Sequence, residues 1–266
     1  MPGKPLVMGI INATTDSFFE GHLNKGLAGI SSLAAKMIAD GADILDIGAQ
    51  STRPGSTRMD AAAEIKRAVP FIEAIKKNHP EAIISIDTYH SKTALEAVNA
   101  GASIVNDISA GDMDAGMLKT VASLNVPFIA MHMQGTPETM QQNPHYDNVI
   151  IEVLDFFIAK TAACKQAGIQ DVIIDPGFGF GKTIQHNFQL LKNLAVFEML
   201  EKPILAGISR KGMIHKTLGI GAAEALNGTA CLNTIALLNG ATILRVHDVK
   251  EAKQAVQLFE AYHAAQ

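Results

Sequence analysis

The chain has 266 residues, of which 48% are hydrophobic and 18% are charged, and its formal net charge is −4 at pH 7. This charge balance excludes the basic surface expected of a protein that binds nucleic acid or an anionic membrane. No apolar run approaches the roughly 18 residues of a membrane span, and no signal peptide is visible, so we expect a cytoplasmic protein. Cys164 and Cys231 lack metal-ligand spacing and are expected to be reduced packing residues.

Short apolar runs alternate with amphipathic segments from one end of the chain to the other. The apolar runs predict strands at residues 6–12, 43–48, 82–87, 102–107, 126–132, 171–175, 203–208 and 241–246. The amphipathic segments predict helices at residues 23–40, 59–78, 91–100, 115–124, 148–168, 187–200, 224–239 and 250–264. Several of these helices end on a glycine directly before the next strand, namely Gly41, Gly101, Gly168 and Gly240.

Eight consecutive βα units predict an α/β fold, a (β/α)₈ TIM barrel formed as a single domain over residues 1–266. Parallel strands need helical crossovers between them, and eight such units close into a ring without an exposed sheet edge. The alternative fold is an open doubly wound sheet. It is disfavoured because no Gly-x-Gly-x-x-Gly pattern follows the first predicted strand.

A glycine-rich stretch, IIDPGFGFGKT at residues 173–183, ends in Gly-Lys-Thr like a nucleotide-binding phosphate loop. Such a loop needs a glycine where Pro176 stands, because successive backbone N–H groups must surround a phosphate. Proline has no N–H to contribute. We therefore expect no phosphate role for Lys182, and a different purpose for the glycines beside the carboxylate of Asp175.

Polar side chains stand at the end of every predicted strand, which is where the active site of such a barrel forms. They are Asn12, Asp46, Asp87, Asn106 with Asp107, His132, Asp175, Ser209 to Lys211, and Arg245 with His247. Any one of them could be a helix cap or could satisfy a strand end. Together they are difficult to explain as caps, and they predict a functional site.

The chemistry of these residues divides into two groups. One group offers carboxylates, an amide and a cation, which suit the edge of a planar heterocycle with N–H donors and ring acceptors. The other offers a cation and neutral donors, which suit a diphosphate and its metal ion. The first group consists of Asp87, Asn106, Asp175 and Lys211. The second consists of Asn12, Arg245 and His247.

Two connections are long for a barrel, at residues 12–21 and 50–58. They mix hydroxyl, acidic, arginine and aromatic residues, which is typical of a mobile lid over a reactive centre. The alternative is that both are disordered connections.

Eight motifs follow one another along nearly the whole chain. They are GIINATTDSF, DIGAQSTRPGS, SIDTY, IVNDIS, MHMQGTP, IIDPGFGFGKT, GISRKGMI and LRVHDV. In this order they resemble the motifs of the dihydropteroate synthase family. The resemblance implies a (β/α)₈ barrel, and a transferase of folate biosynthesis that uses Mg²⁺ and is the target of sulfonamides. The implied reaction condenses 6-hydroxymethyl-7,8-dihydropterin diphosphate with 4-aminobenzoate and gives 7,8-dihydropteroate and diphosphate.

The resemblance also implies a role for individual residues. The pterin would be held by Asp87, Asn106, Asp175 and Lys211, with Met131 against the ring. The diphosphate would be held by Arg245 and His247, and Asn12 would meet the Mg²⁺ ion. The aminobenzoate side would involve Thr52, Arg53, Pro54, Phe180 and Gly212. Catalysis would depend on Arg53, Lys211, Arg245 and His247.

A homodimer is implied as well, with the Ala- and Leu-rich segment 222–238 as a candidate face. The alternative is that this segment is an ordinary helix packed on the barrel. We expect only small-molecule substrates as further partners, and neither nucleic acid nor a membrane.

Three residues depart from the usual pattern of the family. Thr15 stands where Pro is usual, Glu20 where Asp is usual, and Gly212 where Ser is common. The first two change the rigidity and the reach of the first long connection. The third removes a hydroxyl that would bind the aminobenzoate carboxylate. They affect the expected ligand affinities and sulfonamide response, and leave the expected reaction unchanged.

Two other functions fit parts of the pattern. A methyltransferase that binds methyltetrahydrofolate shares a pterin-reading barrel but needs no diphosphate site, so Arg245 and His247 argue against it. A non-catalytic pterin-binding paralogue would be expected to lose one of Asn12, Arg53, Lys211 or Arg245, and all of these are present.

Overall fold

Eight parallel strands form a barrel in the computed structural model, which describes residues 4–13, 23–50 and 58–265. The strands are β1 (Leu6–Asn12), β2 (Ile44–Gly48), β3 (Ile84–Asp87), β4 (Ile104–Asp107), β5 (Phe128–Met131), β6 (Val172–Asp175), β7 (Leu205–Ala206) and β8 (Ile243–Val246). Every predicted strand is found, and most are slightly shorter than predicted. The strand prediction is therefore confirmed.

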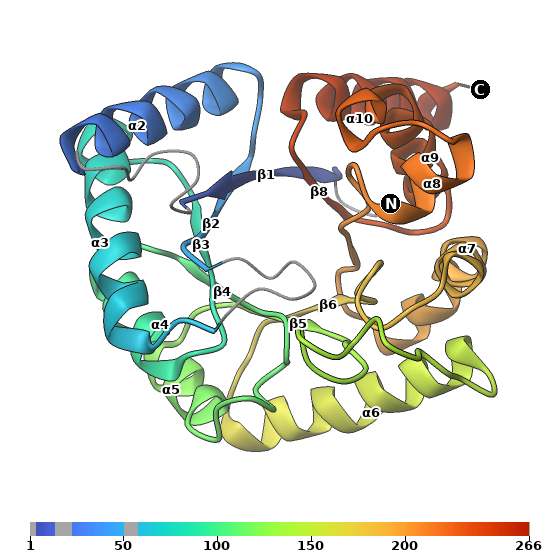
Figure 1. The fold of residues 1–266 in the computed structure, drawn as a ribbon, viewed down its shortest axis with the longest axis horizontal. Coiled ribbons are helices and arrows are strands. Elements are labelled where there is room, and N and C mark those ends of the chain that lie inside the picture. The colour runs from blue at the N-terminus through green and yellow to red at the C-terminus, as the bar shows by residue number, and fades with distance from the viewer. Residues whose placement is uncertain (1–3, 14–22, 51–57, 266) are drawn as a thin grey trace.

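Helices follow the strands and form an outer ring around them, as Figure 1 shows. They are α2 (Leu23–Ala39), α3 (Ala61–Asn78), α4 (Ser91–Asn99), α5 (Met117–Leu124), α6 (Val149–Ala167), α7 (Ile184–Lys192), α8 (Gly212–Leu218), α9 (Leu226–Leu238) and α10 (Val249–Ala264), with the 3₁₀ helices η1 (Leu194–Leu200) and η2 (Ala222–Glu224). In the described ranges, no helix combines the length and the apolar character that crossing a membrane requires.

The helix prediction differs from the structure in two places. One helix is expected over residues 187–200, but the structure has two elements there. The α-helix α7 ends at Lys192 with Asn193 as its C-cap, and the 3₁₀ helix η1 follows from Leu194. The short helix α8 was not predicted. It begins at Gly212, a residue that disfavours helix, and its seven residues are too few to show a clear period.

The ring of strands closes in the order β6-β5-β4-β3-β2-β1-β8-β7. Between β6 and β7 the closure consists of a parallel bridge from Ile174 to Ile204 and a 3.0 Å hydrogen bond from Ile174 N to Pro203 O. The predicted barrel is thus confirmed. The open doubly wound alternative is wrong, because such a sheet would leave two unpaired edges.

The strands bury side chains on both faces. The outward side chains pack against the helices in the main core, which includes Val7, Leu45, Val105, Phe128 and Leu244. The inward side chains form a separate apolar layer across the barrel, which consists of Met8, Ile44, Ile104, Ile129, Ile173, Leu205 and Ile243. Strand side chains repeat every two residues. A residue two positions after this layer must therefore also face the barrel interior.

The glycines predicted to stop helices do so. Gly41, Gly101, Gly168 and Gly240 have φ values of +99°, +117°, +96° and +95°. A residue in this left-handed conformation ends a helix, and glycine adopts it without steric cost. Each stop is followed within four residues by the start of the next strand, so the strand ends are brought to one side of the barrel.

The apolar layer inside the barrel yields a stability prediction. Ile129 is fully buried there, so Ile129→Ala should leave a cavity and lower the free energy of unfolding by about 2–5 kcal/mol. The matched control is Ile158→Ala on α6, where the side chain is 48% exposed and the expected loss is below about 1 kcal/mol. Urea unfolding of both variants measures the difference. Equal losses would contradict the proposed packing of this layer.

Candidate active site

A layer of polar side chains lies next to the apolar layer, toward the carboxyl ends of the strands. Its members Asp46, Asn106, Asp175 and Arg245 come two residues after Ile44, Ile104, Ile173 and Ile243. Because side chains two apart on a strand share a face, all four point into the barrel. Asp87 pairs in register with Gly48 and Asn106 and belongs to the same layer. The alternation of the strands thus assembles the site.

Arg245 is the central residue of this layer. Its Nε donates to Asp46 Oδ2 at 2.6 Å, and its Nη2 donates to Asp87 Oδ2 at 2.6 Å. Asn106 Nδ2 donates to the same Asp46 oxygen at 3.2 Å. Asp46 is completely buried, and the Arg245 side chain is 17% exposed. One guanidinium therefore joins the strand ends of β2, β3 and β8.

The electrostatics of this network follow from its burial. Burial opposes the charge of Arg245, but the carboxylates of Asp46 and Asp87 raise its pKa overall. Burial raises the pKa of Asp87 to about 7, although the Arg245 cation acts in the opposite direction. The protonated and charged forms of Asp87 are therefore similarly populated at neutral pH. A ligand that donates a hydrogen bond to this carboxyl group would favour the charged form.

Asp175 and Lys211 form the other side of the layer. Asp175 Oδ1 accepts a 2.8 Å hydrogen bond from Gly177 N, and Lys211 Nζ donates to Phe178 O. The Lys211 ammonium also lies 4.6 Å from the centroid of the Phe180 ring. Burial lowers the pKa of Lys211 to about 8, which the charge of Asp175 partly opposes. Burial raises the pKa of Asp175, whereas Lys211 lowers it.

The glycine-rich stretch after β6 is a tightly packed loop and not a phosphate site. The Lys182 ammonium is buried and lies 2.9 Å from His132 Nδ1, 3.0 Å from Gly177 O and 3.0 Å from Phe180 O. A Cβ on Gly177 would lie 1.9 Å from His132 O. The expectation that Lys182 has no phosphate role agrees with this geometry, because its donors are directed to His132 and to carbonyl groups of the loop.

The loop after β7 is joined to the end of β8. Ser209 Oγ lies 3.0 Å from His247 Nδ1, and Arg210 donates from Nε and Nη2 to both oxygens of Asp248 at 2.8 Å. Arg210 has a φ of +56°, which is unfavourable for a residue with a side chain. The two-fold contact with Asp248 holds this conformation and fixes the neighbouring Lys211. Partial burial, and then Arg245, lower the pKa of His247, so its imidazole is neutral at pH 7.

The structure separates the residues at the ends of β2 to β6 and β8 by the direction of their side chains. The residues inside the barrel are Asp46, Asp87, Asn106, Met131, Asp175 and Arg245. Asp107 and His132 instead face outward. Asp107 accepts hydrogen bonds from Ser109 N and Gly111 N and closes a turn, and His132 lies against the buried Lys182 ammonium. Thr52, Arg53 and Pro54, like Thr15 and Glu20, lie outside the described residues.

Asp46 is a site residue to which the sequence motifs assign no role. It contacts both Arg245 and Asn106. The signal that could have identified it is its position two residues after Ile44, the same offset that places Asn106, Asp175 and Arg245 inside the barrel.

The metal expected from the sequence has one candidate protein ligand. Asn12 is exposed at the end of β1, and in the described part of the chain no group of three His, Cys, Asp or Glu side chains could hold a metal ion. Mg²⁺ commonly keeps several waters and binds through one or two protein oxygens plus substrate phosphates. A single exposed amide oxygen at the barrel mouth fits an ion that enters with its phosphate ligand.

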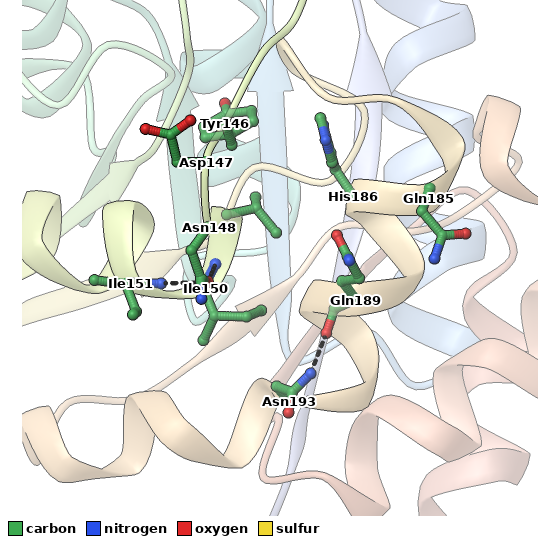
Figure 2. A pocket seen from close by; sticks show the side chains of 10 residues that line it. Tyr146, Asp147, Asn148, Ile150, Ile151, Gln185, His186, Gln189 and Asn193 are labelled. Atoms are coloured by element: carbon green, nitrogen blue, oxygen red, sulfur yellow. Dashed lines mark hydrogen bonds between the residues drawn. The ribbon is translucent and has the colours of Figure 1, made fainter.

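A surface pocket of about 530 Å³ lies elsewhere, between the start of α6 and the first turns of α7 (Figure 2). Several carboxamide side chains line it, including Asn148, Gln185 and Gln189. Asn148 Oδ1 already accepts hydrogen bonds from the first N–H groups of α6. No member of the polar layer is among the lining residues, so this pocket is separate from the candidate active site.

Comparison with known proteins identifies the class to which this barrel and its polar layer belong. The sequence profile of the family described as pterin binding enzyme matches residues 8–247, which extend from β1 to the end of the polar layer.

Individual relatives narrow the class. The dihydropteroate synthase of Escherichia coli is 44% identical over 259 residues, which cover 97% of this chain and 91% of the relative. A solved structure of the Yersinia pestis dihydropteroate synthase in complex with a sulfonamide drug has a TM-score of 0.92 at 38% identity and covers 98% of this chain and 95% of that one. The Xanthomonas albilineans dihydropteroate synthase with 4-aminobenzoic acid has the same TM-score and identity, with 99% and 94% covered.

The chain therefore belongs to the pterin-binding enzymes, and within them to the dihydropteroate synthase family. The resemblance seen in the sequence motifs is confirmed.

The position of Asp46 predicts that it supports activity through Arg245. In Asp46→Asn the guanidinium loses a charged acceptor and gains an amide with a donor, so kcat/KM should fall by about ten- to a hundredfold. The matched control is Asp43→Asn, which also removes a carboxylate paired with a cation, Lys253, but outside the barrel interior. Its kcat/KM should stay near that of the original protein. Similar losses of kcat/KM in both variants would contradict a role of Asp46 in activity through Arg245.

Proposed function

We propose that this protein condenses 6-hydroxymethyl-7,8-dihydropterin diphosphate with 4-aminobenzoate, and releases 7,8-dihydropteroate and diphosphate as a transferase of folate biosynthesis. The observation that carries the proposal is the polar layer, in which a single arginine joins Asp46 and Asp87 and stands opposite Asp175 and Lys211. Its supports are the family of the chain and the ligands of its structural relatives, which include 4-aminobenzoic acid and 7,8-dihydropteroate.

The pterin belongs between the carboxylates of the layer. Asp87 and Asp175 would accept hydrogen bonds from the N–H groups of the ring, while Asn106 and Lys211 would meet its acceptor atoms. Met131 pairs in register with Asp175 and is 3% exposed, so its thioether can lie against the flat ring. The described residues thus supply both an edge and a face for a planar heterocycle.

The diphosphate belongs on the outer side of Arg245. Within the described residues, the hydrogen bonds from its guanidinium to Asp46 and Asp87 use Nε and Nη2, which leaves Nη1 for an anionic acceptor. His247 and, outside the described residues, Arg53 would add further donors. Asn12 would hold a Mg²⁺ ion, which supplies charge neutralisation for the departing diphosphate.

Catalysis would then consist mainly of charge stabilisation. Arg245 favours departure of the diphosphate, which leaves a carbocation-like methylene on the pterin, and the neutral aryl amine attacks that carbon. Phe180 and Thr52 to Pro54 would form the aminobenzoate side and help exclude water. A strong general base is not required, because the amine carries a lone pair at pH 7.

The assembly proposed is a homodimer. Its support is a set of exposed large apolar side chains on α9 and α10, two helices that contact each other. Ile235, Leu238, Leu258 and Tyr262 are 41%, 53%, 72% and 68% exposed. Exposed apolar surface of this kind often marks a protein–protein contact. For the compartment we propose the cytoplasm, a reducing environment that suits the free thiols of Cys164 and Cys231.

The function is tested by incubating the purified protein with the pterin diphosphate, radiolabelled 4-aminobenzoate and Mg²⁺. Labelled 7,8-dihydropteroate should form, and its formation should stop when a chelator removes the metal. Arg245→Ala serves as the control and should reduce turnover by about 10²–10³-fold, as for other groups that stabilise developing charge. A protein that binds the pterin without forming product would instead be the non-catalytic paralogue.

The raised pKa of Asp87 gives a pH prediction. The free carboxyl is largely protonated below its pKa of about 7, whereas the pterin-bound carboxylate is charged. Binding should therefore release a proton at pH 6, and the affinity for the pterin should increase by up to about tenfold from pH 6 to pH 7.5. Calorimetric titration in buffers of different ionisation enthalpy measures both quantities. Asp87→Asn should bind weakly at every pH and should lose this proton release, and an unchanged release would assign it to another group.

Gly212 gives a prediction for the second substrate. A Cβ at this position would be 3.7 Å from its nearest described neighbour, so a serine fits. Gly212→Ser should lower the KM for aminobenzoate by up to about tenfold, the value of one ordinary hydrogen bond, and should change the ratio of the sulfonamide inhibition constant to that KM. Gly212→Ala is the matched control, because it adds the Cβ without the hydroxyl. If the two variants behave alike, the hydroxyl does not reach the carboxylate.

A further inference from the structure

The three residues that follow β3 contact the first turn of α3 or the connection that leads to it from β2. Thr88 Oγ1 donates to Glu64 Oε2 at 2.6 Å, and His90 Nε2 lies 2.9 Å from Met59 O. Between them, the hydroxyl of Tyr89 accepts a hydrogen bond from Gln50 Nε2. This turn begins directly after Asp87, one of the carboxylates bound to Arg245.

Tyr89 also belongs to the wall of the site. Its side chain is 2% exposed and packs in one apolar cluster with Ile108 and Met131, against which Phe180 is partly buried. The guanidinium carbon of Arg58 lies 5.2 Å from the centroid of the Tyr89 ring, a cation–π distance. The ring therefore has Met131 as a neighbour and Arg58 as a cover, and its hydroxyl reaches Gln50.

Gln50 and Arg58 have a particular place in the chain. They stand immediately before and after residues 51–57, which include Thr52, Arg53 and Pro54 and are themselves outside the described residues. A single aromatic side chain thus contacts the described residues on both sides of the segment that carries these three residues. It packs with Met131 as well, so Gln50 and Arg58 are linked through one ring to the proposed pterin pocket.

The hydroxyl of Tyr89 is not needed to fill space, but it accepts the hydrogen bond from Gln50. A phenylalanine would fill the same space between Ile108 and Met131 and would still present a ring to Arg58. The buried amide of Gln50 would, however, lose its partner, and its Oε1 already accepts no hydrogen bond within the described structure. An unpaired buried amide is unfavourable and tends to move toward water.

We propose that Tyr89 is a positioning residue for the second substrate, because it contacts Gln50 and Arg58, the described residues on either side of residues 51–57, and also packs with Met131. This inference rests on the proposed function, in which Thr52, Arg53 and Pro54 serve the aminobenzoate side. Tyr89 itself does not touch the reacting atoms. Its effect should therefore appear in the KM for aminobenzoate and not in the affinity for the pterin.

The experiment compares Tyr89→Phe, Gln50→Leu and the double variant with the original protein. Each single variant should raise the KM for aminobenzoate about five- to twentyfold, while the dissociation constant of the pterin diphosphate changes by less than about twofold. The double variant should be no worse than the worse single variant, because both remove the same hydrogen bond. Gln50→Glu should restore a KM near the original value, since the phenol can donate to a carboxylate.

Two controls make the result specific. Gln170→Leu removes an exposed amide from the connection between α6 and β6, at the amino end of that strand and therefore away from the polar layer, and it should leave both constants unchanged. Tyr89→Leu removes the ring under Arg58 as well, and it should raise the KM further than Tyr89→Phe. Thermal unfolding of each variant shows whether the fold is retained.

The outcomes separate the two proposals. If the original protein forms no product, the proposed function fails. If it is active but Tyr89→Phe leaves the KM unchanged, or raises the KM and the pterin dissociation constant by the same factor, Tyr89 is only a packing residue and the inference is overturned. Additive effects of Tyr89→Phe and Gln50→Leu would also overturn it, because they would show that the two side chains act independently.

Discussion

The ion pair that joins Arg245 to Asp46 and Asp87 is the interaction on which the rest of the site depends. Inside the barrel, Asp46, Asp87 and Asp175 face two cations, Arg245 and Lys211, in a space with little water. An isolated buried charge is expensive, so each of these groups persists only because the others are present. Carboxylates that are not fully neutralised are suited to N–H donors of a neutral heterocycle. The leftover hydrogen-bonding capacity of Arg245 is suited to an anion.

The barrel makes this cluster possible through the two-residue period of its strands. Ile44, Ile104, Ile173 and Ile243 lie in one layer, and the residues two positions later form the next. The first layer fills the barrel interior with apolar side chains. The second layer places charged and polar side chains next to it, toward the carboxyl ends of the strands. The outward residues between them pack against the helices. One alternating pattern therefore provides stability on one face and the chemistry on the other.

The same pattern explains how much could be predicted from the sequence. The strands, the glycine stops and the polar strand ends are local features, and each can be read within a short window. The contact of Asp46 with Arg245 joins residues 199 positions apart, and the contact of Gln50 with Tyr89 joins two connections. Such pairings depend on strand register, which the sequence does not state. The direction of a side chain is easier to predict, because the two-residue period that places Met131 and Asn106 inside the barrel turns the next residues, His132 and Asp107, outward.

The Gly-Lys-Thr sequence at residues 181–183 shows why a motif must be interpreted in its structural setting. Lys182 is nearly as buried as the acids of the site, and burial lowers its pKa to about 7. Its ammonium is surrounded by backbone carbonyl groups and by His132, whose pKa is lowered to about 2 by burial and by Lys182, so that its ring remains a neutral acceptor. In a phosphate loop the lysine reaches outward to a ligand. Here it holds the loop from within, and Phe180 and the partners of Lys211 are placed as a consequence.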